Sequence, residues 1–162
     1  HNVTGDQSIR SCADVAKFCG ADSLQGVRAR QYCGKTCGCD NPFAPSLFLE
    51  VGMGCPKACQ DRQQPLLEAN PCVNQDSSWK FENYRAAMAH AMTYYPEGHR
   101  AFTISVQEAV EQGGCSNVSK PIYSGGYAVD LCSDFNWVHW KPIALICPEA
   151  CSCRNRTSET LP

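Results

Sequence analysis

The sequence predicts a small disulfide-rich fold, mainly helical and irregular, with a few short strands. The chain of 162 residues contains 13 cysteines, a density close to that of secreted proteins stabilised by disulfides. The spacing Cys-x3-Cys-x-Cys occurs at residues 33–39 and 147–153, and a shorter echo lies at residues 55–59. We name each seven-residue segment with this spacing a knuckle. The most regular helical periodicity lies in residues 76–114, which contain no cysteine.

The composition indicates an extracellular, secreted protein. Thirteen cysteines favour an oxidising compartment, because a reducing cytosol does not maintain disulfides. The first residues do not have the pattern of a signal peptide, so we expect His1 to lie near a mature N-terminus. Three Asn-x-Ser/Thr sequons predict N-linked glycans on exposed segments, at Asn2, Asn117 and Asn155.

Charge and hydropathy argue against two classes of partner. The net charge is −2 and no basic cluster is present, so nucleic acid is not expected. No apolar run approaches the ~18 residues of a membrane-spanning helix, so we expect no membrane span.

Two short helices are expected near the N-terminus. Ser11 is a candidate N-cap for a helix over residues 12–18. Ser23 is a candidate N-cap for a helix over residues 24–32, with Gly34 as its C-terminal glycine.

The next part of the chain is expected to be mostly irregular. Residues 41–45 contain two prolines and predict a turn or connector. The apolar run at residues 47–51 predicts a short buried strand. Residues 60–75 are polar and include Pro65 and Pro71, so we expect a loop with one helical turn at most.

Residues 79–95 give the clearest helix. Ser77 or Ser78 begins it and Pro96 ends it. A single face carries the apolar residues Tyr84, Met88, Ala91, Met92 and Tyr95.

A second helix is expected to begin at the capping box Ser105-Val106-Gln107-Glu108. The pair Gly113-Gly114 is expected to end it.

Beyond Cys115 the pattern favours short strands at residues 127–131 and 143–147. Between them, residues 135–140 are rich in aromatic side chains. Such a segment fits either local core or an exposed contact surface, because tryptophan is favoured at interface hot spots. The candidate contact residues are Phe135, Trp137 and Trp140.

One cysteine module is expected to occur twice. Thirteen residues separate Cys19 from the first knuckle, and fourteen separate Cys132 from the second. The echo at residues 55–59 is a candidate fragment of a third copy. All thirteen cysteines are disulfide candidates: Cys12, Cys19, Cys33, Cys37, Cys39, Cys55, Cys59, Cys72, Cys115, Cys132, Cys147, Cys151 and Cys153.

The N-terminal cysteine segments read Ser11-Cys12-Ala13-Asp14, then Cys19, then Tyr32-Cys33-Gly34-Lys35-Thr36-Cys37-Gly38-Cys39. This order resembles the ShK-toxin-like (ShKT) domain family. The resemblance covers residues 11–39 well and residues 115–153 loosely. Tandem modules with Cys-Pro-x-x-Cys segments also resemble secreted cysteine-rich proteins of protists such as dinoflagellates.

The ShKT resemblance implies bridges from Cys12 to Cys39 and from Cys19 to Cys33. The family's third cysteine has no counterpart in the first copy, so Cys37 needs a partner outside it. Cys55, Cys59 and Cys72 are the candidates for that partner.

The second copy also matches five of the family's six positions, at Cys115, Cys132, Cys147, Cys151 and Cys153. The first 75 residues hold eight cysteines, which can all pair internally. The odd cysteine is therefore expected in the C-terminal copy or in a bridge to another chain. The expected organisation is an exposed arm (1–11), an ShKT-like module with an extension (12–75), a helical insert (76–114), a second ShKT-like module (115–153) and a polar tail (154–162).

The favoured function is that of a non-enzymatic extracellular glycoprotein, a structural or binding subunit without a cofactor. Its expected partners are other copies of itself or an extracellular protein. Self-assembly into a filament, coat or matrix is one version of this function, since contacts that do not close generate filaments.

Two alternatives come from other classes. A copper-dependent secreted oxidase would use His1 in a histidine brace, with His90, His99 or His139 as the second ligand. An ShK-like channel-binding protein is implied by the resemblance, but the Lys-Tyr pair of that family is absent here, and only Arg28 or Arg30 could substitute. No G-x-S-x-G elbow is present, and in an oxidising compartment disulfides are favoured over a zinc site at the knuckles.

Overall fold

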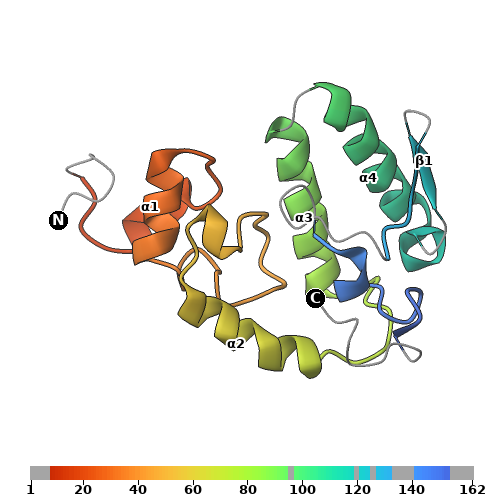
Figure 1. The fold of residues 1–162 in the computed structure, drawn as a ribbon, viewed down its shortest axis with the longest axis horizontal. Coiled ribbons are helices and arrows are strands. Elements are labelled where there is room, and N and C mark those ends of the chain that lie inside the picture. Colours follow the sequence, from red (N-terminus) through yellow and green to blue (C-terminus); the bar gives the residue numbers. More distant parts are fainter. Residues whose placement is uncertain (1–7, 95–96, 119–120, 125–126, 133–140, 154–162) are drawn as a thin grey trace. The chain divides into compact units, whose positions relative to one another are not determined.

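The computed structural model describes residues 8–94, 97–118, 121–124, 127–132 and 141–153 (Figure 1). The fold is helix-rich, with six disulfides and, in these residues, one two-stranded sheet, which confirms the predicted fold class. Within the same residues, no helix combines the length and hydropathy needed to cross a membrane.

The chain divides into two compact units, which we call the N-terminal unit (His1–Ala69) and the C-terminal unit (Asn70–Pro162). The helical segment 76–114 and the second cysteine module belong to the same unit.

The N-terminal unit begins with the 3-10 helix η1 (Ala13–Phe18). The expected N-cap at Ser11 is wrong, because the Ser11 hydroxyl donates to Asp14 Oδ2 instead of accepting from the backbone. The same Asp14 oxygen accepts the N–H groups of Arg10 and Ser11. These bonds stabilise the carboxylate and lower the pKa of Asp14.

Helix α1 (Leu24–Tyr32) confirms the second prediction. The Ser23 hydroxyl accepts the N–H of Gly26, as an N-cap does. Gly26 lowers intrinsic helix propensity, yet a Cβ at this position would run into the Ala21 carbonyl. Close packing of α1 on the preceding turn therefore explains the glycine.

Two predictions in the middle of this unit are wrong. Residues 47–50 are bends and irregular backbone rather than a strand, and the 3-10 helix η2 (Val51–Met53) follows them. The Glu50 carbonyl accepts the N–H groups of both Met53 and Cys55, so the chain folds back on itself there. Leu47, Phe48 and Leu49 are nevertheless buried, because irregular backbone can bury an apolar run as well as a strand can.

Residues expected to be loop form helix α2 (Lys57–Glu68). Pro56 precedes it with φ −62°, a value suited to a helix start. Pro65 lies inside the helix, where it removes one backbone hydrogen bond. Pairs at i and i+4 support the exposed face, Lys57 with Asp61 and Gln64 with Glu68.

The C-terminal unit is built around α3 (Trp79–Tyr94) and α4 (Glu97–Val118), which pack together. The Ser78 hydroxyl accepts the N–H of Phe81, confirming the predicted start of α3. Three residues of the predicted apolar face, Tyr84, Met88 and Ala91, are buried. Met92 is half-buried, and Tyr95 lies outside the described residues.

Helix α4 starts eight residues before its predicted N-cap. Ser105 lies inside the helix, and its hydroxyl donates to the Ala101 carbonyl, a local bond that serine makes in helix interiors. The predicted break is present, because Gly114 leaves helical geometry with φ 52° and ψ −140°. A further turn, ending at Val118, follows this break.

The strands β1 (Ile122–Ser124) and β2 (Tyr127–Val129) form an antiparallel hairpin in which Tyr123 faces Ala128. The predicted strand at 127–131 is thus present in shortened form, and β1 packs on α4. The predicted strand at 143–147 is wrong, because this segment contains the 3-10 helix η3 (Ile143–Leu145).

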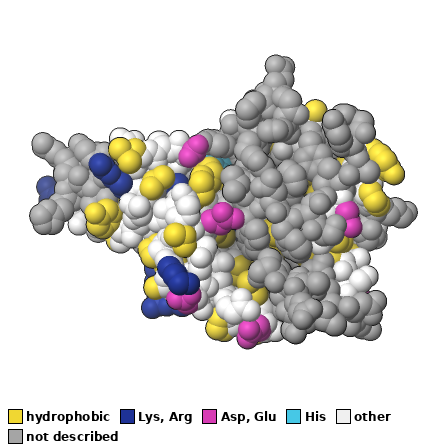
Figure 2. All heavy atoms as spheres, in the orientation of Figure 1, with side chains coloured by type: hydrophobic (Ala, Val, Ile, Leu, Met, Phe, Trp, Pro, Cys, Tyr) yellow, Lys and Arg dark blue, Asp and Glu magenta, His cyan; other side chains and the backbone are white. Residues whose placement is uncertain are grey.

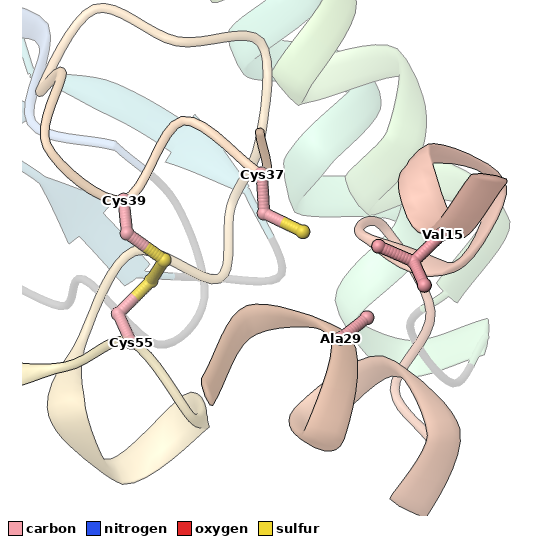
Figure 3. Close-up of a cluster of buried hydrophobic side chains, with 5 residues drawn as sticks. All are labelled: Val15, Ala29, Cys37, Cys39 and Cys55. Carbon is pink, nitrogen blue, oxygen red and sulfur yellow. A yellow bond between two sulfur atoms is a disulfide. The ribbon is translucent and has the colours of Figure 1, made fainter. Parts of the chain in front are cut away.

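Disulfide sulfur forms much of the core of the N-terminal unit. Val15 of η1 and Ala29 of α1 pack with cysteines of the first knuckle (Figure 3). Ile9 and Phe18 cover this cluster. The fully buried cluster consists of Val15, Ala29, Cys37, Cys39 and Cys55.

Candidate functional site

The first knuckle is one helical turn closed by a left-handed residue. The N–H of Cys37 donates to the Cys33 carbonyl at 3.0 Å, and the N–H of Cys39 donates to the Gly34 carbonyl at 2.8 Å. Gly38 has φ 75° and donates to the Lys35 carbonyl. These bonds form a Schellman motif. Gly34, predicted as the C-terminal glycine of α1, does follow the C-cap residue Cys33, but its φ is not positive.

The second knuckle repeats this geometry. The N–H of Cys151 donates to the Cys147 carbonyl at 3.0 Å, and the N–H of Cys153 donates to the Pro148 carbonyl at 2.9 Å. Ser152 takes the left-handed position with φ 58°. The repeat inferred from cysteine spacing is therefore also a repeat of backbone structure.

The two knuckles also share their connectivity. In each, the first and second cysteines bond in order to the two cysteines upstream in the module. The third bonds to a further cysteine, which lies 16 residues downstream in the first case and 81 residues upstream in the second. The bridges are Cys12–Cys33, Cys19–Cys37 and Cys39–Cys55 in the N-terminal unit, and Cys115–Cys147, Cys132–Cys151 and Cys72–Cys153 in the C-terminal unit.

The pairing implied by the ShKT resemblance differs from these bridges. Neither Cys12–Cys39 nor Cys19–Cys33 forms. The expectation that Cys37 pairs with Cys55, Cys59 or Cys72 is also wrong, because Cys37 bonds to Cys19. Cys33 and Cys37 lie one helical turn apart, so both face η1. They form disulfides with Cys12 and Cys19, which lie on either side of η1. The left-handed residue between Cys37 and Cys39 directs Cys39 toward Cys55 (Figure 3).

The echo at residues 55–59 is not a third knuckle. The N–H of Cys59 donates to the Pro56 carbonyl, and the chain continues into α2 instead of closing with a left-handed residue. A Cβ at Gly34 would lie 3.0 Å from Pro56 Cδ and 3.1 Å from Cys59 Sγ. Gly34 thus allows α2 to begin directly against the first knuckle.

Cys59 is the odd cysteine, and all thirteen cysteines lie in described residues. The expectation that it belongs to the C-terminal copy is wrong. Cys72 forms a disulfide with Cys153, so the cysteines of that copy are all paired and the unpaired one is Cys59 of the N-terminal unit. Burial and the Asp40 carboxylate raise the pKa of the Cys59 thiol, against a smaller effect of Arg62. Because the thiolate is the reactive form, Cys59 is a poor nucleophile at neutral pH.

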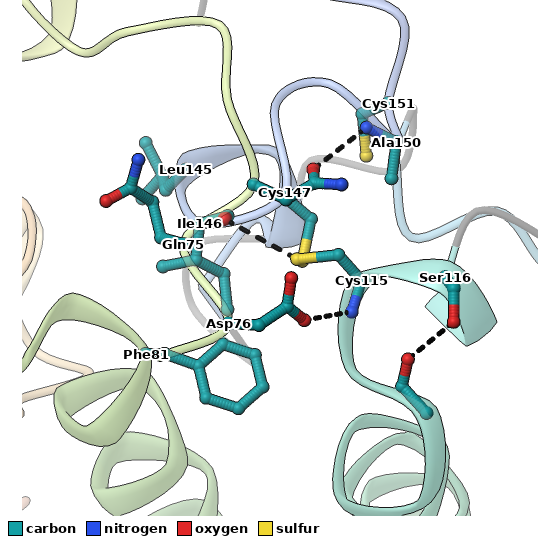
Figure 4. Close-up of a disulfide and its surroundings, with 12 residues drawn as sticks. Gln75, Asp76, Phe81, Cys115, Ser116, Leu145, Ile146, Cys147, Ala150 and Cys151 are labelled. Carbon is teal, nitrogen blue, oxygen red and sulfur yellow. Dashed lines mark hydrogen bonds between the residues drawn. A yellow bond between two sulfur atoms is a disulfide. The ribbon is translucent and has the colours of Figure 1, made fainter. Parts of the chain in front are cut away.

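Asp76, near the start of the C-terminal unit, accepts a hydrogen bond from the backbone at the break in α4. Its Oδ1 accepts the N–H of Cys115 at 2.7 Å (Figure 4). A Cβ at Gly114 would collide with this carboxylate, so the position requires glycine both for space and for its positive φ. The Cys115–Cys147 bridge lies beside this contact, with Cys115 Sγ 3.6 Å from the Ile146 carbonyl oxygen.

Arg30 is fully buried in the N-terminal unit, which sequence reasoning did not predict. Its Nε donates to the Met53 carbonyl and its Nη1 to the carbonyls of Cys19 and Ala21. Its guanidinium lies 4.8 Å from the ring centroid of Phe48. Burial lowers the pKa of Arg30, opposed by Asp22. The side chain thereby links α1 to residues 19–21, to Phe48 and to η2.

Two titratable side chains are buried among the described residues of the C-terminal unit. Lys141 is 3% exposed, and burial lowers its pKa to about 7. Tyr84 is 2% exposed, and burial raises its pKa. Neither lies in a group of histidine, cysteine or acidic side chains that could hold a metal, since the described residues contain no such group.

The remaining predicted site residues are only partly described. Asn117 is exposed in the last turn of α4, and His90 is half-buried on α3. His99 lies in α4, but its side chain is not described. The structure therefore does not test a histidine brace. Outside the described residues lie Asn2, Asn155, Phe135, Trp137, Trp140, His1 and His139.

The exposed apolar side chains lie on both units. On α1, Leu24 and Tyr32 are 65% and 70% exposed and lie on the same helical face as Arg28. In the C-terminal unit, Trp79 is 57% and Tyr123 is 76% exposed. On the face in Figure 2, hydrophobic and charged side chains are interspersed across the described surface.

No protein-family model, no curated protein and no solved structure matches this chain. Its function is therefore argued from its own geometry.

Proposed function

We propose that the chain is a non-enzymatic extracellular glycoprotein that acts as a structural or binding subunit. Its partner is another copy of the chain or an extracellular protein. The repeated knuckle supports this role, because six bridges make two rigid modules that can each present a surface. Each bridge typically contributes ~2–4 kcal/mol.

The connectivity of the bridges carries the proposal. Three bridges close within each unit, and every bonded cysteine finds its partner there. Two separately closed modules suit a protein that binds at two places, because two linked contacts bind more tightly than either alone.

The exposed face of α1 is the best described candidate contact surface. It presents Leu24, Arg28 and Tyr32 in one row on a helix. The segment that follows this helix is joined by two disulfides to the cysteines on either side of η1. Tyrosine and arginine are enriched at interface hot spots. The aromatic segment 135–140 remains the second candidate, on its sequence alone.

The relation to ShKT domains remains a proposal, supported by the cysteine spacing of residues 11–39. A channel-binding role has less support, because the bridges differ from those that the resemblance implies. The favoured role is binding to a second copy, without a covalent link through the shielded thiol of Cys59.

The experiment is a measurement of assembly state on the secreted full chain. Light scattering after size exclusion and electron microscopy of the purified protein test for oligomers or filaments. The double variant Leu24→Ser, Tyr32→Ser is expected to weaken assembly, while the matched variant Leu66→Ser, on the exposed face of α2, is expected to leave it unchanged. A monomer at all concentrations, in both methods, would exclude self-assembly.

A further inference from the structure

Helix α4 has an exposed face that combines an apolar side chain with a carboxylate. Ile104, Glu108 and Gln112 follow one another at intervals of four residues, so they lie in one row on the helix. All three side chains are exposed, Ile104 by 39%. We call this row the α4 face. It lies on the opposite side of the helix from the buried Val106 and Val110.

Glu108 gives the α4 face a negative charge. Among the described residues, no basic side chain lies within ion-pair distance of Glu108. Glu111, on the same side of the helix, lies 3.7 Å from Arg85 Nη2 and is partly neutralised by it. Glu82, an exposed acidic residue of α3, also pairs with Arg85. Of the acidic side chains described on these two helices, Glu108 is therefore the one best placed to bind a cation from outside.

The row Leu24, Arg28 and Tyr32, which we call the α1 face, has the same spacing and the opposite charge. Its residues also follow one another at intervals of four, and α1 contains no acidic residue. Each row covers two such intervals, about 12 Å at a rise of 1.5 Å per residue. The α1 face and the α4 face therefore match in length and complement each other in charge.

The α1 face does not complement itself. In a two-fold contact the same surface meets itself, so the centre of one row lies against the centre of the other. Arg28 would then approach Arg28 of the second copy, and like charges brought together at a contact weaken binding. The chemistry of the α1 face therefore requires a partner surface with a carboxylate at its centre.

We infer that the α1 face of one copy binds the α4 face of a second copy. The inference rests on the proposed binding between copies and names the second surface. With the two helices parallel, each side chain meets one of matching chemistry: Leu24 meets Ile104, Arg28 meets Glu108, and Tyr32 meets Gln112. The antiparallel direction would place Leu24 against the Gln112 amide, so the parallel direction fits better.

This contact is heterologous, because it joins two different surfaces. The α1 face belongs to the N-terminal unit and the α4 face to the C-terminal unit. A molecule that binds through its α1 face still presents its own α4 face, so a third copy can add. Such contacts generate rings when they close and filaments when they do not. The expected oligomers are therefore larger than a dimer.

The test exchanges charges across the contact in the secreted full chain, with light scattering after size exclusion as the measure of assembly. Arg28→Glu and Glu108→Arg should each raise the concentration needed for assembly by about tenfold or more, because each brings like charges together. An equimolar mixture of the two variants should assemble as the parent does, since every contact then joins opposite charges. Lys57→Glu and Asp61→Arg make the same changes of charge on α2 and should leave assembly unchanged.

The mixture also controls for folding, because a misfolded variant could not restore assembly. Circular dichroism checks that each variant keeps the helix content of its parent. Arg28→Gln and Glu108→Gln remove one charge without adding another, so they should weaken assembly by similar, smaller factors. These two variants test the contact even where a charge reversal disturbs a helix.

Assembly that Arg28→Glu weakens but Glu108→Arg leaves unchanged would overturn the inference, because α1 would then bind a different surface. Two well-folded variants whose mixture stays dissociated would overturn it as well. In both cases the proposed binding between copies would stand. A parent protein that stays monomeric at all concentrations would instead refute that binding, and the inference with it, so the two failures are distinguishable.

Discussion

Gly38 and Ser152 occupy the same position in the two knuckles, and both have a left-handed backbone, with φ 75° and 58°. Each lies between the second and third cysteine and donates its N–H to a carbonyl three residues earlier. Glycine adopts this conformation freely, whereas a residue with a Cβ does so at a cost of roughly 1–2 kcal/mol. The second knuckle therefore holds strain that the first avoids.

Ser152→Gly is expected to stabilise the C-terminal unit by about 0.5–1 kcal/mol, because the relief of strain exceeds the entropy cost of a glycine. Gly38→Ser should destabilise the N-terminal unit by about 1–3 kcal/mol, since its Cβ would also lie 2.7 Å from Ala44 Cβ. Urea unfolding of the oxidised proteins measures both. Thr36→Gly is the control and should lose a few tenths of a kcal/mol. A less stable Ser152→Gly variant would contradict the argument.

The bridges predict that the units separate without reduction. A specific protease site inserted between Ala69 and Asn70 should, once cut, give two fragments on a non-reducing denaturing gel, because no bridge crosses this boundary. The same site inserted after Ser124 is the control, since Cys115–Cys147 spans it and should hold the fragments together. Fragments that separate at residue 69 only after reduction would show a bridge between the units.

Arg30→Met is expected to destabilise the N-terminal unit by about 3 kcal/mol. The substitution leaves the buried carbonyls of Cys19, Ala21 and Met53 without their donor, and an unsatisfied buried polar group costs about 1–3 kcal/mol. Arg28→Met on the exposed face of the same helix should change stability by less than about 1 kcal/mol. Amide hydrogen exchange in α1 measures the loss of stability directly. Equal protection of α1 in the two variants would refute a stabilising role for Arg30.

The sequence correctly predicted the helices whose ends and faces depend on residues close together in the chain. Ser23 caps α1 and the apolar spacing of Tyr84, Met88 and Ala91 gives the buried face of α3. The capping box at Ser105 misled because a serine hydroxyl bonds equally well to a carbonyl inside a helix. Pro65 misled because an exposed helix tolerates the loss of one hydrogen bond.

The bridges could not be read from spacing, because several pairings satisfy the same order of cysteines. Their pattern depends on the left-handed residue at Gly38, which redirects Cys39 alone. Arg30 was likewise missed, since its burial depends on carbonyls that are 9, 11 and 23 residues away.

Cys59 is expected to remain a thiol. Burial and Asp40 raise its pKa, so its thiolate fraction at neutral pH is below that of an ordinary cysteine. Alkylation of the native protein should therefore be slow at pH 7. The pH at which alkylation speeds up should be higher for the native protein than for an unstructured cysteine peptide. In denaturant, one thiol per chain should react fully. Migration as a monomer on a non-reducing gel is expected. A reducible dimer that disappears in Cys59→Ser would contradict this prediction.

Lys141 makes the stability of the C-terminal unit depend on pH. Its pKa falls from 10.5 to about 7 on folding. Between these values the unfolded chain binds a proton that the folded chain lacks, so the free energy of unfolding rises with pH, by up to about 1.4 kcal/mol per unit. As pH falls toward 7, this stability is lost.

Lys141→Met should remove this dependence. At pH 7 the variant is expected to be more stable than its parent by about 2–4 kcal/mol, and the difference should shrink steadily toward pH 10. Urea unfolding in a Cys59→Ser background avoids thiol exchange at the higher pH values. Lys57→Met, at an exposed lysine of α2, is the control and should differ from its parent by a small, constant amount. A pH-independent difference for Lys141→Met would show that Lys141 keeps its proton in the folded protein.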